Sequence, residues 1–276
     1  MSLGIFAAEG PHISLSAEPV AQFGDFTLTN SMLYGVVVSM CLLAVAYYAA
    51  RRAGKRPGGW LTSIFELTLE FIINMLEGIF NNRQKALQYA PIFATFFIFI
   101  VFTNLSGLLP LVGGGFSAGE GTLFRPFTAD LNGTIAMSVV AILTVQVLSI
   151  KESGWLGHLK HYFTDKPFNP INLFIGILEI FGEFSRIVSL SLRLFFNTAL
   201  GEVLIAILAF LGQEYGSFTL LPIYLFEILV AVVQAYIFTV LSATYLGLAI
   251  NHGDHDEEHQ VQHVKKMEDA TAGIAG

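Results

Sequence analysis

The chain has 276 residues, of which 54% are apolar and 13% are charged. A soluble domain typically carries about 25% charged residues, so this composition excludes an ordinary soluble enzyme and a disordered chain. The formal net charge of −7 argues against nucleic-acid binding, which needs a basic surface. Cys41 is the one cysteine, so an internal disulfide is excluded. We therefore expect an all-α integral membrane protein.

The first part of the chain predicts three membrane-crossing helices. The first 25 residues lack the basic start and apolar run of a signal peptide, and we interpret residues 1–30 as a segment outside the membrane. A spanning helix needs about 20 mostly apolar residues. Three runs meet this condition: 32–50, 90–112 and 131–150.

Residues 60–82 predict an amphipathic helix. Polar residues recur there at spacings of four, four and three: Glu66, Glu70, Asn74 and Glu77. This spacing places them on one face of a helix whose other face is apolar. Such a helix lies in the plane of the interface rather than crossing the bilayer. A kinked spanning helix with a polar stripe is the alternative.

Two later apolar runs, 169–211 and 220–250, are too long for an upright crossing. At 1.5 Å per residue they would reach roughly 65 Å and 46 Å, whereas the hydrocarbon core is about 30 Å thick. Their prolines, Pro170 and Pro222, lie near the helix starts, where proline is tolerated. We expect two long, strongly tilted helices, with broken helices as the alternative.

The basic residues predict the orientation. Five crossings with the N-terminus outside place 11 of the 14 on the cytoplasmic side, as positive residues prefer: Arg51, Arg52, Lys55, Arg56, Arg83, Lys85, Lys151, Lys160, Lys166, Lys265 and Lys266. Arg125 lies outside in this arrangement. The membrane domain then covers 31–250, and 251–276 form a polar cytoplasmic tail. A bacterial inner membrane is the simplest setting.

Charged residues inside the two long runs are the candidates for function. An ionisable residue at the bilayer centre costs about 2.5–3.5 kcal/mol on insertion scales. Seven charged residues nevertheless lie between residues 169 and 250, together with the amides Asn197 and Gln234: Glu179, Glu183, Arg186, Arg193, Glu202, Glu214 and Glu227. Such a group indicates a path for ions or protons. Ion pairs that only hold helices together are the alternative.

Helical geometry divides these residues into faces. At about 100° per residue, Asn197 falls on the side of Arg193, whereas Glu202 falls on the opposite side. Glu227 and Gln234 are seven residues apart and share one face of the last helix. Arginine keeps its charge at any accessible pH, and glutamates can exchange protons. A fixed cation with carboxylates nearby is what a gated proton route requires.

Several segments resemble one known family. The sequence SLSLRLFFNTALGE at 189–202 looks like the core motif of the a subunit of F-type ATP synthases. The sequence QAYIFTVLSATYL at 234–246 resembles the closing helix of that subunit. LSGLLP at 105–110 and TADLN at 128–132 match further positions of the family. The similarity extends from about residue 27 to 252.

The resemblance implies the stator subunit of a rotary motor, without a site for ATP chemistry and without a cofactor. It implies a ring of c subunits and the peripheral-stalk b subunits as partners. Two offset half-channels would carry H⁺ to and from the ring, with Na⁺ left open. Arg193 matches the essential arginine that faces the ring carboxylates. Further residues match positions of the ion pathway: Asn197, Glu202, Glu227, Gln234, Asp130, Asn132, Glu179 and Arg186. Some relatives carry histidine where this chain has Glu227.

Other interpretations predict different chemistry. A self-contained ion-coupled secondary transporter also places charges in the membrane, but usually with repeats and helices broken at the midplane. A membrane scaffold is a third possibility. In the tail, His255, His259 and His263 are spaced by four, as metal ligands can be. The acidic residues between them favour a solvated tail, so we expect no metal site.

Overall fold

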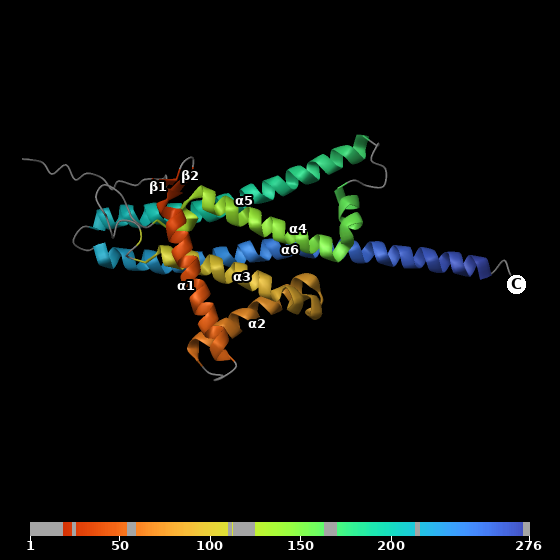
Figure 1. Cartoon of the computed structure of the whole chain (residues 1–276), viewed down its shortest axis with the longest axis horizontal. Coiled ribbons are helices and arrows are strands. Elements are labelled where there is room, and N and C mark those ends of the chain that lie inside the picture. Colours follow the sequence, from red (N-terminus) through yellow and green to blue (C-terminus); the bar gives the residue numbers. More distant parts are fainter. Residues whose placement is uncertain are drawn as a thin grey trace, which may run out of the picture. The chain divides into compact units, whose positions relative to one another are not determined.

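The structure is a computed structural model, and it describes residues 19–23, 26–53, 59–109, 112, 125–162, 170–212 and 216–272. The side chains of residues 249–272, which include the tail histidines, lie outside this description, as do residues 1–18 and 273–276. The elements in chain order (Figure 1) are β1 (Pro19–Phe23), β2 (Phe26–Thr29), α1 (Asn30–Ala53), α2 (Trp60–Phe80), α3 (Arg83–Gly107), η1 (Phe127–Ala129), α4 (Leu131–Tyr162), α5 (Pro170–Gly212) and α6 (Gly216–Ala272).

The helices confirm the predicted all-α membrane architecture. Five helical stretches within the described residues are long and apolar enough to cross a membrane: Asn30–Arg52, Arg83–Gly107, Leu131–Glu152, Gly176–Leu208 and Leu220–Leu248. Helix α2 is not among them. The chain divides into two compact units, and we describe each unit by itself. The first holds residues 1–65, 95–138 and 188–238, and the second holds 66–94, 139–187 and 239–276.

Helix α2 has three faces rather than two. Ile72 and Leu76 are fully buried within the second unit. The side chain of Glu70 is exposed on a second face. Phe71 is exposed on a third face, roughly 100° from Glu70 by helical geometry. A helix with separate protein, polar and apolar faces suits the boundary between lipid and water. Its position in the bilayer stays a prediction.

Two asparagines separate α2 from α3. Asn81 has φ 51°, the left-handed conformation that commonly ends a helix. The Oδ1 atom of Asn82 then accepts hydrogen bonds from the backbone N–H groups of Gln84 (2.9 Å) and Lys85 (3.2 Å). This N-cap satisfies two donors of the first turn. Helix α3 therefore begins seven residues before the predicted start at 90, and it ends at Gly107 rather than at 112.

Helices α5 and α6 are each unbroken (Figure 1), so the alternative of broken helices is excluded. They have 43 and 57 residues. Pro222 interrupts neither the course nor the dihedral angles of α6. Helix α4 does contain a break. Its Gly154 has non-helical backbone angles, with φ 72° and ψ 159°. Because α5 and α6 are continuous, they must tilt strongly or extend beyond the hydrocarbon core.

Two parts of the chain differ from the expected secondary structure. Helix α6 continues to Ala272, 22 residues past the predicted end at 250, because Glu, Gln, Lys and Met are good helix formers. A short antiparallel hairpin, β1 and β2, precedes α1, with Gln22 opposite Thr27. The sequence places Gly24 and Asp25 between its strands, and such residues favour turns.

The second unit is held together by contacts among α2, α3, α4 and α6. The buried Tyr89 hydroxyl donates a hydrogen bond to Glu152 of α4, and Lys85 Nζ lies 3.6 Å from the same carboxylate. These bonds join α3 to α4. At Gly247 of α6, an added Cβ would lie 2.9 Å from Ile79 Cγ2. Glycine therefore permits the close approach of α2 and α6, as small residues do between membrane helices.

In the first unit, a turn at Pro126 and Phe127 inserts among three helices. A Cβ added at Gly35 of α1 would lie 2.6 Å from the Phe127 ring. A Cβ added at Gly133 of α4 would lie 2.7 Å from the Phe127 carbonyl oxygen. Pro126 likewise packs on Gly107 at the end of α3. Glycine at positions 35, 107 and 133 thus leaves the space that the turn occupies.

We predict that Gly133→Ala lowers the free energy of unfolding by about 1–3 kcal/mol, because the new methyl meets backbone that cannot move aside easily. Gly78→Ala is the matched control, since nothing lies within 4 Å of a Cβ added there. That variant is expected to be neutral or to gain up to about 1 kcal/mol from helix propensity. Denaturant titration of the purified chain in detergent measures both. Equal stability of the two variants would contradict the packing described for Phe127.

Candidate functional site

Arg193 lies at the edge between the buried and exposed faces of α5. Leu190 and Leu194, on its buried side, are 2% and 0% exposed, whereas Phe196 on the other side is 50% exposed. The Arg193 side chain itself is partly exposed. Among the described residues, none forms a hydrogen bond or an ion pair with its guanidinium. A charge of this kind at a helix surface is available to a partner from outside the chain.

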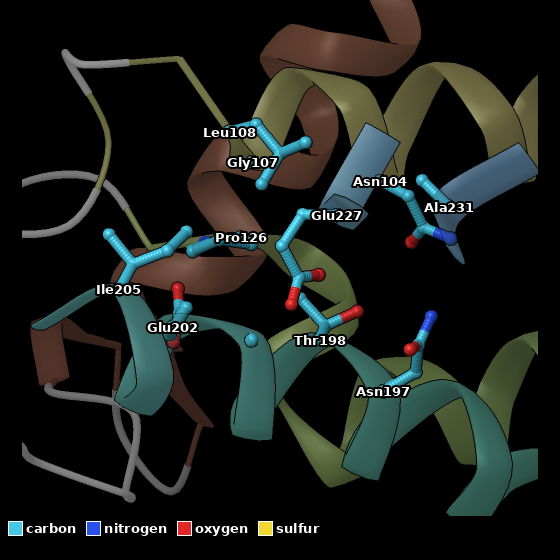
Figure 2. A pocket seen from close by; sticks show the side chains of 11 residues that line it. Asn104, Gly107, Leu108, Pro126, Asn197, Thr198, Glu202, Ile205, Glu227 and Ala231 are labelled. Atoms are coloured by element: carbon cyan, nitrogen blue, oxygen red, sulfur yellow. The ribbon is translucent and has the colours of Figure 1, made fainter. Parts of the chain in front are cut away.

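A cavity of about 40 Å³ lies within the first unit. This volume exceeds the about 10–15 Å³ that one water molecule requires. Figure 2 shows its lining, to which α3, α5 and α6 contribute. Its residues are Asn104, Gly107, Leu108, Pro126, Asn197, Thr198, Gly201, Glu202, Ile205, Glu227 and Ala231. Two carboxylates and two amides therefore share one small space.

Glu227 reaches the cavity from α6 and lies directly against the backbone of α5. A Cβ added at Gly201 would be 2.6 Å from Glu227 Oε2 and 2.8 Å from Oε1. In Figure 2 the Glu227 carboxylate points toward Thr198 of α5. The residue is 8% exposed. Glycine at 201 is thus what lets this carboxylate approach α5.

Glu202 enters the same cavity from α5, on the side of Pro126 (Figure 2). Because α5 is unbroken, Glu202 and Arg193 lie on opposite sides of it, as the sequence predicts. Arg193 accordingly does not line the cavity. Asn197, one turn from Arg193, does line it. Asn197 is thus one turn from Arg193 along α5 and lines the same cavity as the two carboxylates, although the sequence grouped it with Arg193 rather than with Glu202.

Asn104 is a cavity residue that sequence reasoning missed. It is 6% exposed, and neither its Nδ2 nor its Oδ1 atom has a hydrogen-bond partner in the part of the chain that the structure describes. Buried amides are rarely left without a partner, so a water molecule in the cavity is the expected partner. The available signal was an asparagine inside a predicted spanning segment.

Arg125 is the second residue that was missed. It is 6% exposed, and its Nη2 atom donates a hydrogen bond of 3.2 Å to the Ala129 carbonyl oxygen. Its charge interacts with that of Glu202. The sequence placed Arg125 in a loop outside the membrane, where a solvated side chain is the ordinary expectation. Its burial arises from packing that the sequence alone does not disclose.

Asp130 and Asn132 do not line this cavity, and their place on the ion pathway stays a prediction. Asp130 Oδ2 accepts a 2.6 Å hydrogen bond from Ser31 Oγ of α1. Its Oδ1 atom accepts a 3.0 Å bond from the Asn132 backbone N–H and so caps the start of α4. The Asn132 side chain is exposed. Local capping accounts for the position of Asp130.

Gln234 lies on the Glu227 side of α6, two turns farther along. It is 6% exposed, and its Nε2 atom has no partner among the described residues. Ala231, between the two, lines the cavity, whereas Gln234 does not. The structure therefore places Gln234 beyond the cavity, where its buried Nε2 group needs a hydrogen-bond acceptor.

The second unit contains Glu179 and Arg186, the other predicted pathway residues. Arg186 Nη1 lies 2.6 Å from Glu183 Oε1. Its guanidinium also stacks 4.4 Å from the ring centroid of Tyr245, which is a favourable cation–π geometry. Glu179 is partly exposed on the same helix. Arg186 is thus paired within the chain, unlike Arg193.

No metal site is found in the described part of the chain: no three His, Cys, Asp or Glu side chains there are grouped to hold an ion. The tail histidines lie outside the described side chains, so the expectation of a solvated tail stays a prediction. Cys41 is exposed.

Comparison with known proteins agrees with the resemblance read from the motifs. Residues 32–247 match the family described as ATP synthase A chain. ATP synthase subunit a of Gloeobacter violaceus is 31% identical over 253 residues, covering 91% of this chain and 92% of the relative. The subunits a of Moorella thermoacetica and Ehrlichia canis are 32% and 33% identical, covering 83% and 86% of this chain and 94% and 99% of theirs. The chain therefore belongs to the ATP synthase A chain family.

Proposed function

We propose that the cavity shared by Glu202 and Glu227, together with Arg193, forms the ion path of this subunit. Membership of the family makes the chain a non-catalytic stator subunit in the membrane sector of the proton-transporting ATP synthase. The observation that carries the residue assignment is the cavity itself. Two glutamates from different helices meet there with Asn104 and Asn197. The helices that carry these four residues are otherwise apolar enough to cross a membrane.

The chemistry of the cavity supports proton relay. A glutamate can take up and release a proton, and water hydrogen-bonded to the Asn104 and Asn197 amides would connect the two carboxylates. The proton then leaves the cavity for a carboxylate on a partner subunit. H⁺ is the proposed ion. A transport assay that measures the flux of H⁺ and of Na⁺ separately distinguishes the two ions.

Arg193 is proposed to face that partner carboxylate. A guanidinium stays charged in a low-dielectric setting and offers a rigid fork of donors that matches a carboxylate. It attracts an ionised carboxylate and repels a cation, so protons cannot pass directly from one half-channel to the other. Glu179 and the Arg186–Glu183 pair are proposed to lie along the half-channel on the cytoplasmic side.

The exposed apolar surface of α5 and α6 in the first unit is the proposed contact with a ring of c subunits. On α5 this surface includes Phe196 and Leu200, and on α6 it includes Leu225 and Leu229. Arg193 interrupts this surface as a lone charge, which gives a ring carboxylate one place to pair. The peripheral-stalk b subunits are further proposed partners. The proposed setting is a bacterial inner membrane with the N-terminus outside and the C-terminus in the cytoplasm.

A self-contained secondary transporter has less support. Transporters commonly bind substrate at helices that are discontinuous at the midplane. Helices α5 and α6, which carry the charged residues, are each continuous.

We predict that Arg193→Ala lowers ATP-driven proton pumping by more than about 100-fold, a loss typical of removing an essential electrostatic stabiliser. Arg193→Lys is also expected to be severely impaired, because lysine lacks the planar fork and can lose its proton when buried. Inverted membrane vesicles containing the whole complex provide the assay. Arg83→Gln is the control, since Arg83 forms an exposed pair with Glu77 and such pairs contribute little. Pumping that survives Arg193→Ala would refute the proposed role.

We further predict that Asn104→Leu reduces passive proton flow through the membrane sector by about tenfold or more, because the cavity loses the amide that holds its water. Ser138→Ala removes another buried hydroxyl without a described partner, and Ser138 does not line the cavity. That control should conduct as the unaltered protein does. Conduction by Asn104→Leu equal to that of Ser138→Ala would argue against a hydrated relay.

A further inference from the structure

Arg125 is a buried cation that has no role in the ion path proposed above. Only 6% of the residue is exposed. The next residue, Pro126, lines the cavity that holds Glu202 and Glu227. An isolated buried charge is costly unless it meets an opposite charge or enough hydrogen bonds. The position of Arg125 therefore requires an explanation in terms of its surroundings.

The turn that carries Arg125 is fixed in place. Arg125 Nη2 donates to the Ala129 carbonyl oxygen at 3.2 Å, so the guanidinium folds back over the turn. Thr128 of the turn is joined to α5 by a 3.1 Å hydrogen bond from Thr198 Oγ1. Phe127 is packed against Gly35 and Gly133. The guanidinium is therefore held at a constant place relative to the part of α5 that carries Thr198 and Glu202.

Two carboxylates in one small cavity repel each other when both are ionised. Glu227 from α6 is the other acidic side chain of the lining, and the remaining polar ones, Asn104, Asn197 and Thr198, are neutral. Glu202 lies on the Pro126 side, whereas Glu227 points toward Thr198 (Figure 2). The charge of Arg125 interacts with that of Glu202.

We propose that Arg125 is a positioning residue of the ion path, whose fixed charge holds the Glu202 carboxylate at the Pro126 wall of the cavity, apart from Glu227. This inference rests on the proposed function of the cavity. It assigns the loop before α4 a second role besides connection. Arg125 acts through Glu202 and does not itself exchange protons, since a guanidinium stays charged.

The first test uses inverted vesicles with the whole complex and compares Arg125→Gln with Arg125→Lys. Glutamine keeps a hydrogen-bond donor for Ala129 but has no charge. Lysine keeps the charge at this buried position if it pairs with the Glu202 carboxylate, because an opposite charge favours the protonated amine. We expect ATP-driven pumping to fall severalfold in Arg125→Gln and to recover largely in Arg125→Lys. Arg83→Gln again controls for loss of a surface arginine. Normal pumping by Arg125→Gln, or equal impairment of the lysine variant, would overturn the proposal.

A second test asks whether Arg125 acts through Glu202. Denaturation midpoints are measured for Arg125→Gln, Glu202→Gln and the double variant. If the two charges are paired, each single variant lowers the midpoint, and the double variant loses less than the sum of the two losses. Strictly additive losses would mean that Arg125 does not act through Glu202, which overturns the inference.

A third measurement keeps failure of the inference separate from failure of the proposed function. In a Cys41→Ser background, Ile205→Cys places a thiol in the cavity lining, and its labelling by a small water-soluble thiol reagent reports access. Labelling unchanged by Arg125→Gln, with reduced pumping, supports a charge effect, whereas lost labelling indicates a collapsed cavity and overturns the inference. If Arg193→Ala stops pumping and Arg125→Gln pumps normally, only the inference fails. If pumping survives Arg193→Ala, the proposed function fails as well.

Discussion

The cost of placing polar groups in hydrocarbon is the constraint on which the rest of this structure depends. Water cannot satisfy a charge or an amide in the bilayer core, so such groups must find partners inside the protein. In the first unit Glu227, Gln234 and Asp130 are buried, whereas Leu200 and Leu225 are exposed. This inside-out distribution concentrates polar chemistry at a few internal points. The cavity is the point where two carboxylates meet.

The helices come together closely where side chains are missing. Gly201 brings the Glu227 carboxylate against α5, and Gly133 brings the Phe127 turn against α4. In the second unit Gly247 does the same for α2 and α6. Such contacts rely on shape rather than on apolar burial, because lipid tails solvate apolar side chains as well as a protein interior does. The geometry of the polar groups is thus a consequence of where the chain lacks a Cβ.

Local properties of the sequence predicted most of the elements. Apolar length predicted the five spanning segments, and the four-residue recurrence of Glu66 and Glu70 predicted the amphipathic helix. The continuity of α5 and α6 was open, because length alone is compatible with either a tilted helix or a broken one. The hairpin before α1 and the start of α3 at Arg83 depended on turn and cap chemistry that hydropathy does not register.

The candidate site was predictable only in part, because it joins residues that are distant along the chain. The spacing of Arg193 and Glu202 placed them on opposite sides of α5. It grouped Asn197 with Arg193, whereas Asn197 lines the cavity together with Glu202. The sequence around Asn104 and Arg125 did not indicate that both side chains would be buried near Glu202. Arg125 directly precedes the Pro126–Phe127 turn, whose packing partners lie on α1, α3 and α4, and Asn104 lies on α3 in the cavity that Pro126 also lines.

The different surroundings of the two arginines of α5 have a consequence for motion. Arg186 is immobilised by Glu183 and Tyr245, so its side chain has already lost most of its rotamer entropy. The Arg193 side chain is bonded to no described residue and retains that entropy, which amounts to about 2 kcal/mol. It can therefore change rotamer without first breaking a bond within its own chain. A side chain of this kind can turn toward a carboxylate of the proposed partner without giving up a contact in its own chain.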